Sequence, residues 1–193
     1  MIKRTFDVAV STVLLVALGP LMAVIALGIR LSSPGPALFR QLRAGHLGKP
    51  FVILKFRTMH RQPATTIETS KADPRIFAFG RLLREFHLDE LPQLWNVLVG
   101  DMSLVGPRPT VPEQVARYTA RQRGRLAVRP GITGLAQVSG GNAIDWDTRI
   151  EVDLEYVTQS GLLSDLSILA RTVRTVIRRE GLYDATGHIR DKA

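Results

Sequence analysis

The chain opens on a long run of uncharged residues, "VAVSTVLLVALGPLMAVIALGI", at positions 8–29. A helix rises about 1.5 Å per residue, so a run of this length can just cross a bilayer core of roughly 30 Å. A signal peptide fits poorly, because the run is too long and no small-residue cleavage site follows it. The pattern predicts a membrane helix, either a plain transmembrane span or a segment that enters and leaves on the same side.

Two features favour the second alternative. Gly19 and Pro20 lie near the middle of the run, where proline removes a backbone hydrogen bond and bends the helix. A true span normally has asymmetric flanks, but here basic residues flank both ends: Lys3, Arg4, Arg30, Arg40 and Arg43. We therefore expect a re-entrant helix-break-helix over residues 1–31, with both ends on the cytoplasmic side.

The next segments have the alternation and turn residues of a hairpin. Residues 37–43 and 50–59 predict two short strands, joined by a turn at 44–49. The Pro, Gly and Ser content of residues 31–36 predicts a loop that separates them from the apolar run. Residues 61–76 are polar without a clear period, which favours a surface loop.

Helical periodicity governs the second half of the chain. Residues 79–86 predict either a short helix or a strand, and the next segment has apolar positions at helical spacing up to Gly100: Leu91, Leu94, Trp95 and Leu98. Residues 112–128 carry arginines four apart, which predicts one basic helical face: Arg117, Arg121 and Arg125.

A C-terminal helix is expected from residue 162 to about 180. Its apolar face either packs on the core or lies on a membrane, and consists of Leu162, Leu166, Leu169, Val173 and Ile177. A second face carries Arg171, Arg174 and Arg178. We predict a mixed α/β (α+β) protein: a re-entrant membrane hairpin at 1–31, a globular domain of short strands and amphipathic interfacial helices at 32–180, and a polar tail at 181–193.

Composition narrows the class of partner. The chain has 193 residues, a formal charge of +9 and a pI of about 10.8, so an anionic partner is expected. No acidic residue lies between Asp7 and Glu68, which is more typical of a membrane surface than of a nucleic-acid site. Aromatic residues make up only 6% and do not interleave with the basic clusters, which argues against nucleic-acid binding. The absence of cysteine excludes disulfides and thiolate chemistry.

Two adjacent carboxylates, Asp89 and Glu90, precede the predicted helix in "HLDELPQLWNVL". Pro92 is typical of a first helical turn, so Asp89 is expected at or near the N-cap, where acids complement the helix dipole. This structural explanation is the stronger one on these residues alone. The same geometry suits an ionised aspartate that attacks phosphorus, with a neighbouring carboxylate holding a divalent cation.

A proline-flanked arginine follows in "GDMSLVGPRP". Pro107 and Pro109 fix the backbone on both sides of Arg108, and a rigidly presented arginine suits bidentate phosphate recognition. A turn with a solvated arginine is an equally good explanation. Lys55 in "KFRTM" and Arg129 in "RPGITG" are weaker candidates of the same kind. The sequence contains no P-loop and no GxGxxG, and its four histidines show no metal-ligand spacing.

Taken together, "KFRTM", "LDELPQLWNVLVGDMSLVGPRP", "RPGITGLAQVSG" and "NAIDW", after the apolar run, resemble the bacterial monotopic phosphoglycosyl transferases, the bacterial sugar transferase family. The resemblance extends from about residue 2 to 180 and is that of the minimal catalytic form. It implies transfer of a sugar-1-phosphate from a UDP-sugar to polyprenyl (undecaprenyl) phosphate, with release of UMP, at the cytoplasmic face of the bacterial inner membrane.

The resemblance also implies roles for particular residues. Asp89 matches the nucleophile of a covalent phosphosugar intermediate, Glu90 matches the residue associated with Mg²⁺, and Pro20 matches the break of the re-entrant helix. The phosphate-binding cations match Lys55, Arg84 and Arg108; we place Pro107, Pro109 and Arg129 in the same substrate-binding group. Many members carry arginine where this chain has Gly141, which leaves the sugar open. The rival hypothesis is a non-catalytic basic module that binds a membrane surface.

Overall fold

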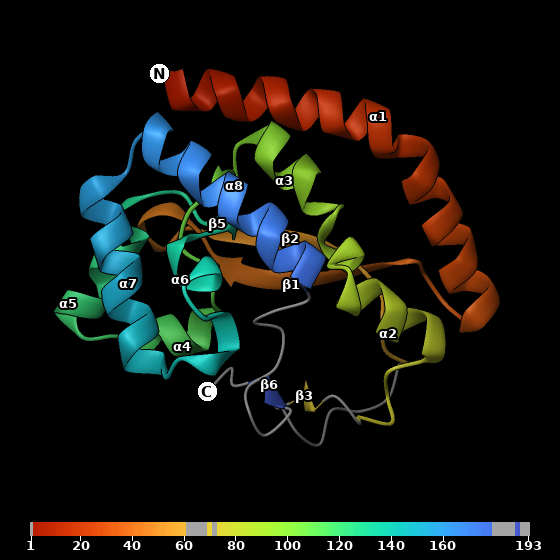
Figure 1. Cartoon of the computed structure of the whole chain (residues 1–193). Coiled ribbons are helices and arrows are strands. Elements are labelled where there is room, and N and C mark those ends of the chain that lie inside the picture. The colour runs from red at the N-terminus through yellow and green to blue at the C-terminus, as the bar shows by residue number, and fades with distance from the viewer. Residues whose placement is uncertain (1, 61–68, 71–72, 179–187, 190–193) are drawn as a thin grey trace.

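The computed structural model describes residues 2–60, 69–70, 73–178 and 188–189. A long helix, α1 (Ile2–Ser32), lies along one side of a body of shorter helices and two-stranded sheets (Figure 1). The mixed helix-and-strand class predicted from the sequence is therefore confirmed.

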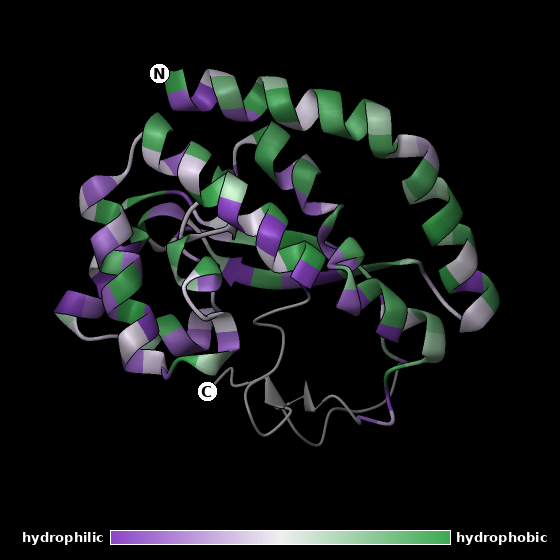
Figure 2. Cartoon of the chain, in the orientation of Figure 1, coloured by the Kyte–Doolittle hydropathy of each residue, from purple (hydrophilic) through white to green (hydrophobic). Residues whose placement is uncertain are grey.

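The helix α1 contacts the body at both ends. Near its start Asp7 and Ser11 are buried, and near its end Ile25 and Ile29 pack with core residues that include Leu83. The middle of the helix is strongly apolar (Figure 2), and one of its faces is exposed, with Val13, Val16 and Val24 at 65%, 75% and 66%. It is the one helix, within the part of the chain that the structure describes, that is long and apolar enough to cross a membrane.

The predicted break in this helix is a bend. The segment remains one α-helix of 31 residues with Pro20 inside it, and the ribbon curves along its length (Figure 1). Hydroxyls bond to backbone carbonyls near its beginning: Ser11 Oγ and Thr12 Oγ1 both contact the carbonyl of Val8, at 3.2 and 2.8 Å.

The predicted hairpin is present and carries a lysine toward the body. Strands β1 (Leu38–Ala44) and β2 (Pro50–Phe56) are antiparallel, with Leu38 opposite Phe56, and a short 3-10 turn, η1 (His46–Gly48), joins them. Side chains alternate along a strand, so Phe51, Ile53 and Lys55 share one face. The first two are buried in the core, and Lys55 extends that row beyond it.

The segment with the acidic pair follows the hairpin. Residues 79–86, which the sequence left ambiguous, lie mostly in helix α2 (Ala78–Glu85); next come the 3-10 turn η2 (Leu88–Glu90) and helix α3 (Gln93–Val99). Gly100, with φ of 99°, ends α3 as predicted. Asn96 of α3 ties this segment to the free edge of β2: its Oδ1 accepts from the Leu54 N–H at 3.0 Å and its Nδ2 donates to the Val52 carbonyl at 2.8 Å.

Strands β4 (Ser103–Val105) and β5 (Gly131–Thr133) form a parallel pair behind this segment. The backbones meet so closely that a Cβ on Gly106 would lie 2.3 Å from the carbonyl oxygen of Arg129. Glycine is therefore required where the "GPRP" loop leaves β4.

The single basic helix predicted over residues 112–128 is wrong. The segment divides into α4 (Pro112–Ala116), α5 (Ala120–Arg123) and a 3-10 turn, η3 (Gly124–Ala127). Thr119 forms a capping box with Gln122, which starts a new helix and ends the common face. As a result Arg121 is exposed while Arg125 is buried.

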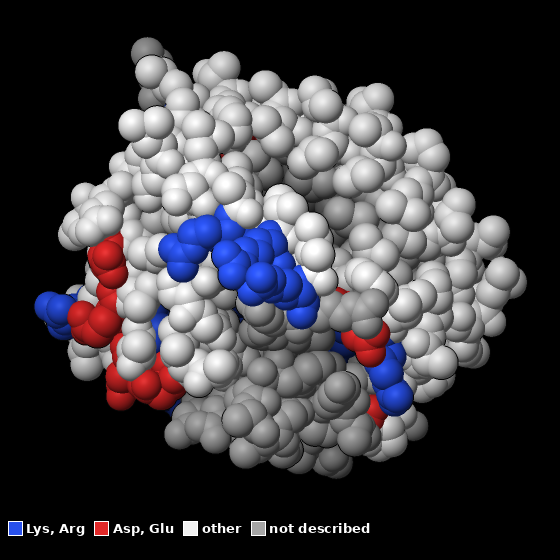
Figure 3. All heavy atoms as spheres, in the orientation of Figure 1, with Lys and Arg blue, Asp and Glu red and all other residues white. Residues whose placement is uncertain are grey.

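The last elements close the body: α6 (Leu135–Val138), a 3-10 turn η4 (Gly141–Ala143), α7 (Trp146–Gln159) and α8 (Leu162–Arg178). The apolar face of α8 divides along the helix: Leu169 packs against the core, while Val173 and Ile177 are 61% and 75% exposed. A patch of basic side chains lies over α8 (Figure 3), made by Arg171, Arg174 and Arg178.

Parts of two predicted segments lie outside the described residues. Of the predicted loop at 61–76, β3 (Thr69–Ser70) is described and pairs antiparallel with β6 (His188–Ile189), which falls within the predicted tail. The rest of the tail at 181–193, and residues 61–68 and 71–72, lie outside them.

Candidate active site

A cavity of about 400 Å³ lies between α1, the acidic turn η2, the β5–α6 segment, α7 and α8. It is lined by most of the residues that the sequence placed in a substrate site: Lys55, Arg84, Asp89, Glu90 and Arg108. These residues come from β2, α2, η2 and the loop after β4, so the fold brings together positions more than fifty apart in the chain. The cavity also has apolar walls, which include Leu14 and Leu18 of α1.

The acidic pair does not cap a helix. Helix α3 begins at Gln93 with Pro92 as its N-cap and no side-chain capping bond, so the predicted N-cap position of Asp89 is wrong. Proline has no N–H to donate. The turn before it is closed by hydrogen bonds that span three residues and not the four of an α-helix, from Glu90 N to His87 O and from Leu91 N to Leu88 O. The capping explanation for the two acids therefore fails, and they lie in a tight turn that presents them to the cavity.

His87 enables that turn. Its φ of 54° lies in the left-handed region, which is unusual for a residue with a side chain. Burial lowers the pKa of His87, and the cations Arg108 and Lys55 add to this effect while Glu90 opposes it. We therefore expect a neutral imidazole in the cavity wall. No pattern in the sequence indicated that His87 lies in the cavity wall, since a lone histidine is usually uninformative.

Glu90 is held by two cations. Its Oε1 accepts from Lys55 Nζ at 2.9 Å and from Arg108 Nη2 at 2.7 Å, and its Oε2 lies 3.4 Å from Arg108 Nη1. Burial alone would raise the pKa of Glu90, but the charges and hydrogen bonds of Arg108 and Lys55 hold it well below its usual range. Glu90 is therefore a permanent carboxylate that fixes both cations at the cavity.

Asp89 has a different environment from its neighbour. Burial, followed by the adjacent charge of Glu90, raises the pKa of Asp89 to about 6, against the opposing pull of Lys55, Arg84 and Arg108. The expectation that the helix start would favour the ionised form is thus not met. The carboxylate is still mostly ionised at pH 7, but it is poorly stabilised, which is the condition of a reactive nucleophile.

Arg84 completes the basic side of the cavity. Its Nε donates to Thr58 Oγ1 at 3.0 Å, which fixes the guanidinium. Its Nη1 is buried without a hydrogen-bond partner among the residues that the structure describes. A donor held in this way is suited to an anionic oxygen from a ligand.

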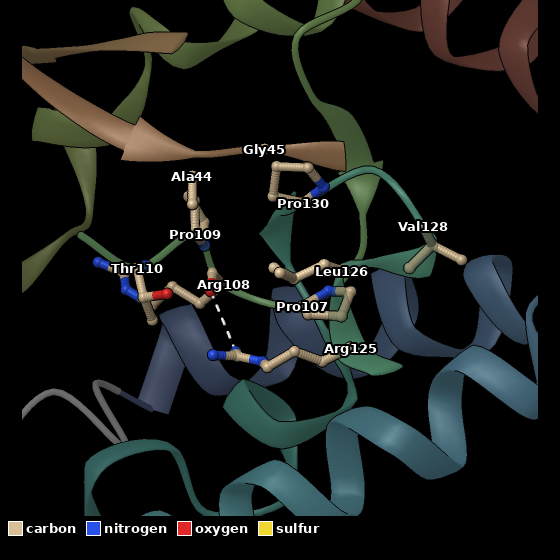
Figure 4. Close-up of a pocket in the computed structure, with 10 residues that line it drawn as sticks. All are labelled: Ala44, Gly45, Pro107, Arg108, Pro109, Thr110, Arg125, Leu126, Val128 and Pro130. Atoms are coloured by element: carbon tan, nitrogen blue, oxygen red, sulfur yellow. Dashed lines mark hydrogen bonds between the residues drawn. The ribbon is translucent and has the colours of Figure 1, made fainter. Parts of the chain in front are cut away.

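Arg108 is presented by a firmly held loop. Its carbonyl accepts a hydrogen bond from Arg125, beside a void of about 10 Å³ lined by residues that include Pro107 and Pro109 (Figure 4). A void of this size holds no more than about one water, so the two prolines contribute by shaping the loop. Arg129, by contrast, lies at the surface, where its Nε donates to the Gly100 carbonyl at 2.9 Å, and it is not among the residues that line the large cavity.

A polar wall was not predicted. Asn142, Arg149 and Asp153 line the same cavity, together with Gly141. Arg149 donates to the Gly141 carbonyl at 2.9 Å and to Asn142 Oδ1 at 3.2 Å. The four-residue spacing of Arg149 and Asp153 on α7 is a weak signal, because most such pairs are solvated surface ion pairs.

The protein side chains at this site supply only part of the ligands that a magnesium ion needs. Across the described ranges no group of three or more His, Asp or Glu side chains lies close enough to hold a metal. Glu90 Oε1 is shared by two cations, while Oε2 has only the long contact to Arg108. Mg²⁺ is commonly bound by one or two carboxylates and by substrate phosphates. Glu90, with Asp89 beside it, fits an ion of that kind.

The fold and the cavity define a class of protein: a domain tied to an apolar helix, with a carboxylate of raised pKa among fixed cations that suit phosphate binding. Comparison with known proteins agrees with this class. The family profile of bacterial sugar transferases matches residues 1–179, and the chain belongs to that family.

Individual relatives extend the comparison. The chain is 44% identical over 191 residues to the UDP-glucose:undecaprenyl-phosphate glucose-1-phosphate transferase of Caulobacter vibrioides, covering 94% of this chain and 72% of that protein. It is 42% identical over 199 residues to the undecaprenyl-phosphate galactose phosphotransferase of Salmonella typhimurium, but it spans only 42% of that protein. An uncharacterized sugar transferase of Bacillus subtilis is 42% identical over 188 residues, with 97% of this chain and 93% of that protein covered.

Proposed function

We propose that the protein transfers a sugar-1-phosphate from a UDP-sugar to polyprenyl phosphate and releases UMP, through a covalent intermediate on Asp89. One observation carries the proposal. The cavity that holds Asp89 and its cations is also lined by Leu14 and Leu18 of the apolar helix α1. A single site that is both strongly cationic and continuous with a membrane helix suits a reaction between a soluble diphosphate and a lipid phosphate.

The chemistry is a double displacement at phosphorus. A carboxylate oxygen of Asp89 attacks the sugar-linked phosphorus, and the bond from that phosphorus to the bridging oxygen breaks, so UMP leaves with the electron pair. An oxygen of polyprenyl phosphate then attacks the same phosphorus, and the bond to Asp89 breaks to regenerate the carboxylate. The raised pKa of Asp89 supports this role, because it marks a carboxylate that the fold does not fully stabilise.

Repulsion between anionic reactants must be neutralised at each step. Lys55 and Arg108 are held at Glu90, and Arg84 directs a buried Nη1 that lacks a protein partner among the described residues. These three cations would bind the phosphate oxygens and stabilise the charge that develops in the transition state. Mg²⁺, held by Glu90 and substrate phosphates, would add further charge neutralisation when bound.

The membrane arrangement is part of the same proposal. We infer a monotopic enzyme of the bacterial inner membrane, with α1 re-entrant and the body on the cytoplasmic face. The contacts of both ends of α1 with one body support it. The exposed apolar strip on α8, next to its basic patch, is typical of a helix at a lipid surface.

The sugar is the open part of the proposal. Of the relatives described above, the name of the Caulobacter protein specifies glucose and that of the Salmonella protein specifies galactose. In this chain Gly141 occupies the position in the polar wall where the resemblance implied an arginine. A panel of UDP-sugars, with UMP release as the readout, tests the whole proposal. We expect turnover of at least one donor, dependent on both polyprenyl phosphate and Mg²⁺. Folded protein that turns over none of the panel would support the rival, a non-catalytic membrane-surface module.

A further inference from the structure

Arg125 is a fully buried cation that does not belong to the group of cations lining the large cavity. It lies in η3 with 2% of its surface exposed, and it forms an ion pair with Asp153 of α7, which is 1% exposed. Removing two charges from water has a large free-energy cost, which their mutual attraction has to offset. A buried pair of this kind is therefore weak as a source of stability, and its hydrogen bonds indicate what else it does.

Those bonds converge on the loop that carries Arg108. The Nη2 atom that pairs with Asp153 also donates to the Arg108 carbonyl at 3.1 Å (Figure 4). The Nη1 atom donates to the Tyr118 hydroxyl at 2.8 Å, and that hydroxyl lies 2.9 Å from Thr110 Oγ1. One guanidinium thus links two positions of the loop to helix α7.

Aromatic rings fix the orientation of this guanidinium. Its central carbon lies 5.6 Å from the ring centroid of Trp146 and 5.9 Å from that of Tyr118. Arginine stacks on aromatic rings while it hydrogen-bonds in its own plane, whereas lysine has one compact ammonium. Lysine can keep the charge beside Asp153 but not the full set of bonds.

The loop depends on bonds to its carbonyl groups, because Pro107 and Pro109 have no N–H to donate. Each carbonyl from 107 to 110 accepts a hydrogen bond, in order from Gly131 N at 3.0 Å, Arg125 Nη2 at 3.1 Å, Arg43 Nη1 at 3.4 Å and Ala44 N at 2.9 Å. The bond to Arg108 is the one made by a fully buried charge. It fixes the backbone from which the Arg108 side chain reaches Glu90.

We propose that Arg125 is a positioning residue that acts through the backbone of Arg108 and sets the place of its guanidinium in the phosphate site. The inference rests on the proposed function. Arg125 does not line the large cavity, so it does not touch a substrate bound there and acts through the backbone of Arg108.

A double-mutant cycle separates this role from general support of the fold. Arg125→Lys is expected to lower kcat/KM by about 10- to 100-fold, the effect of misplacing a catalytic group by a fraction of an ångström to an ångström. In an Arg108→Ala background the same change should lower kcat/KM by less than about 2-fold, because there is no side chain left to position. The same four proteins are also compared by their dissociation constants for the UDP-sugar, a measurement that needs no turnover.

Controls keep the outcomes distinct. Arg121→Lys, at an exposed arginine paired with Glu151, should change nothing. If Arg125→Lys does not fold, Tyr118→Phe removes one partner of the guanidinium with its ring kept, and its smaller loss should also vanish in the Arg108→Ala background. Equal losses in both backgrounds would overturn the positioning role. Wild-type protein without turnover would instead overturn the proposed function, so the two failures are distinguishable.

Discussion

Lys55 Nζ lies 2.9 Å from Glu90 Oε1, and this contact joins strand β2 to the acidic turn across 35 residues of sequence. The pair is largely buried, with side-chain exposures of 18% and 11%. Arg108 reaches the same oxygen at 2.7 Å, so one carboxylate fixes two cations that come from separate parts of the fold. The position of each cation in the site therefore depends on Glu90.

Lys55→Met tests this arrangement. The substitution keeps most of the aliphatic length but removes the ammonium, so Glu90 loses one of its two partners and the phosphate site loses a cation. We expect kcat to fall by about 10²-fold, the usual effect of removing one charged group that stabilises a transition state. UMP release under saturating donor measures it. Lys49→Met, at an exposed lysine of the same hairpin, is the matched control, and an equal effect of both changes would contradict a specific role.

Asp89→Asn should separate activity from stability. The folded state raises the pKa of Asp89 to about 6, so it binds this proton more tightly than the unfolded chain does. The stability that this group contributes is therefore full at low pH and is lost as pH rises through 6. At pH 7 the neutral asparagine should leave the unfolding temperature unchanged or raise it by a few degrees, while UMP release collapses.

Thermal unfolding and turnover of the same preparation check this expectation. Asp147→Asn, which changes an exposed acid of α7, should alter neither quantity. An Asp89→Asn protein with near-normal turnover would exclude Asp89 as the nucleophile. A large drop in its unfolding temperature would show that the carboxylate supports the fold.

The hairpin and the cavity show which parts of the structure the sequence could predict. Strand alternation and turn residues correctly predicted the two strands and the turn between them, because those patterns are local. The onset of α3 was predicted three residues too early, since Pro92 serves as its N-cap and the preceding turn is of the 3-10 type. Local signals alone did not decide whether Pro92 lies inside the first helical turn or at the N-cap.

Local sequence patterns could not predict which polar side chains are buried by tertiary contacts. The spacing of Arg121 and Arg125 predicted one basic helical face, but the capping box at Thr119 divides the helix, and Arg125 is buried where Asp153 compensates its charge. The wall formed by Arg149 and Asp153 was missed for the same reason. A single sequence does not show which distant segments will enclose a polar side chain.

The raised pKa of Asp89 predicts the pH dependence of the first half-reaction. In the proposed mechanism the ionised carboxylate attacks, so the rate of UMP release should rise with pH and level off above about 6. Glu90, with its pKa held well below the usual range, should not contribute in this window. Measuring the UMP burst between about pH 5 and 8 without lipid acceptor excludes titration of the acceptor phosphate. A rate that is flat across this range would contradict the assignment of Asp89.

The topology of α1 can be tested because the chain has no cysteine. Near one end Lys3 forms an ion pair with the buried Asp165, and just beyond the other end Ser33 accepts a hydrogen bond from Arg57 at 2.7 Å. A straight span would place these ends on opposite sides of roughly 30 Å of hydrocarbon and would leave Asp165 buried without its cation, which is strongly destabilising.

Single cysteines at the exposed positions Ile2 and Pro34 report the two ends. An impermeant thiol reagent should label both in inside-out vesicles and neither in intact spheroplasts, because both ends contact the same body, which we propose to lie on the cytoplasmic face. Labelling of the two positions from opposite sides would establish a span and overturn the re-entrant arrangement. Since Leu14 and Leu18 line the cavity of Asp89, that result would also remove the proposed route by which a lipid phosphate reaches the nucleophile.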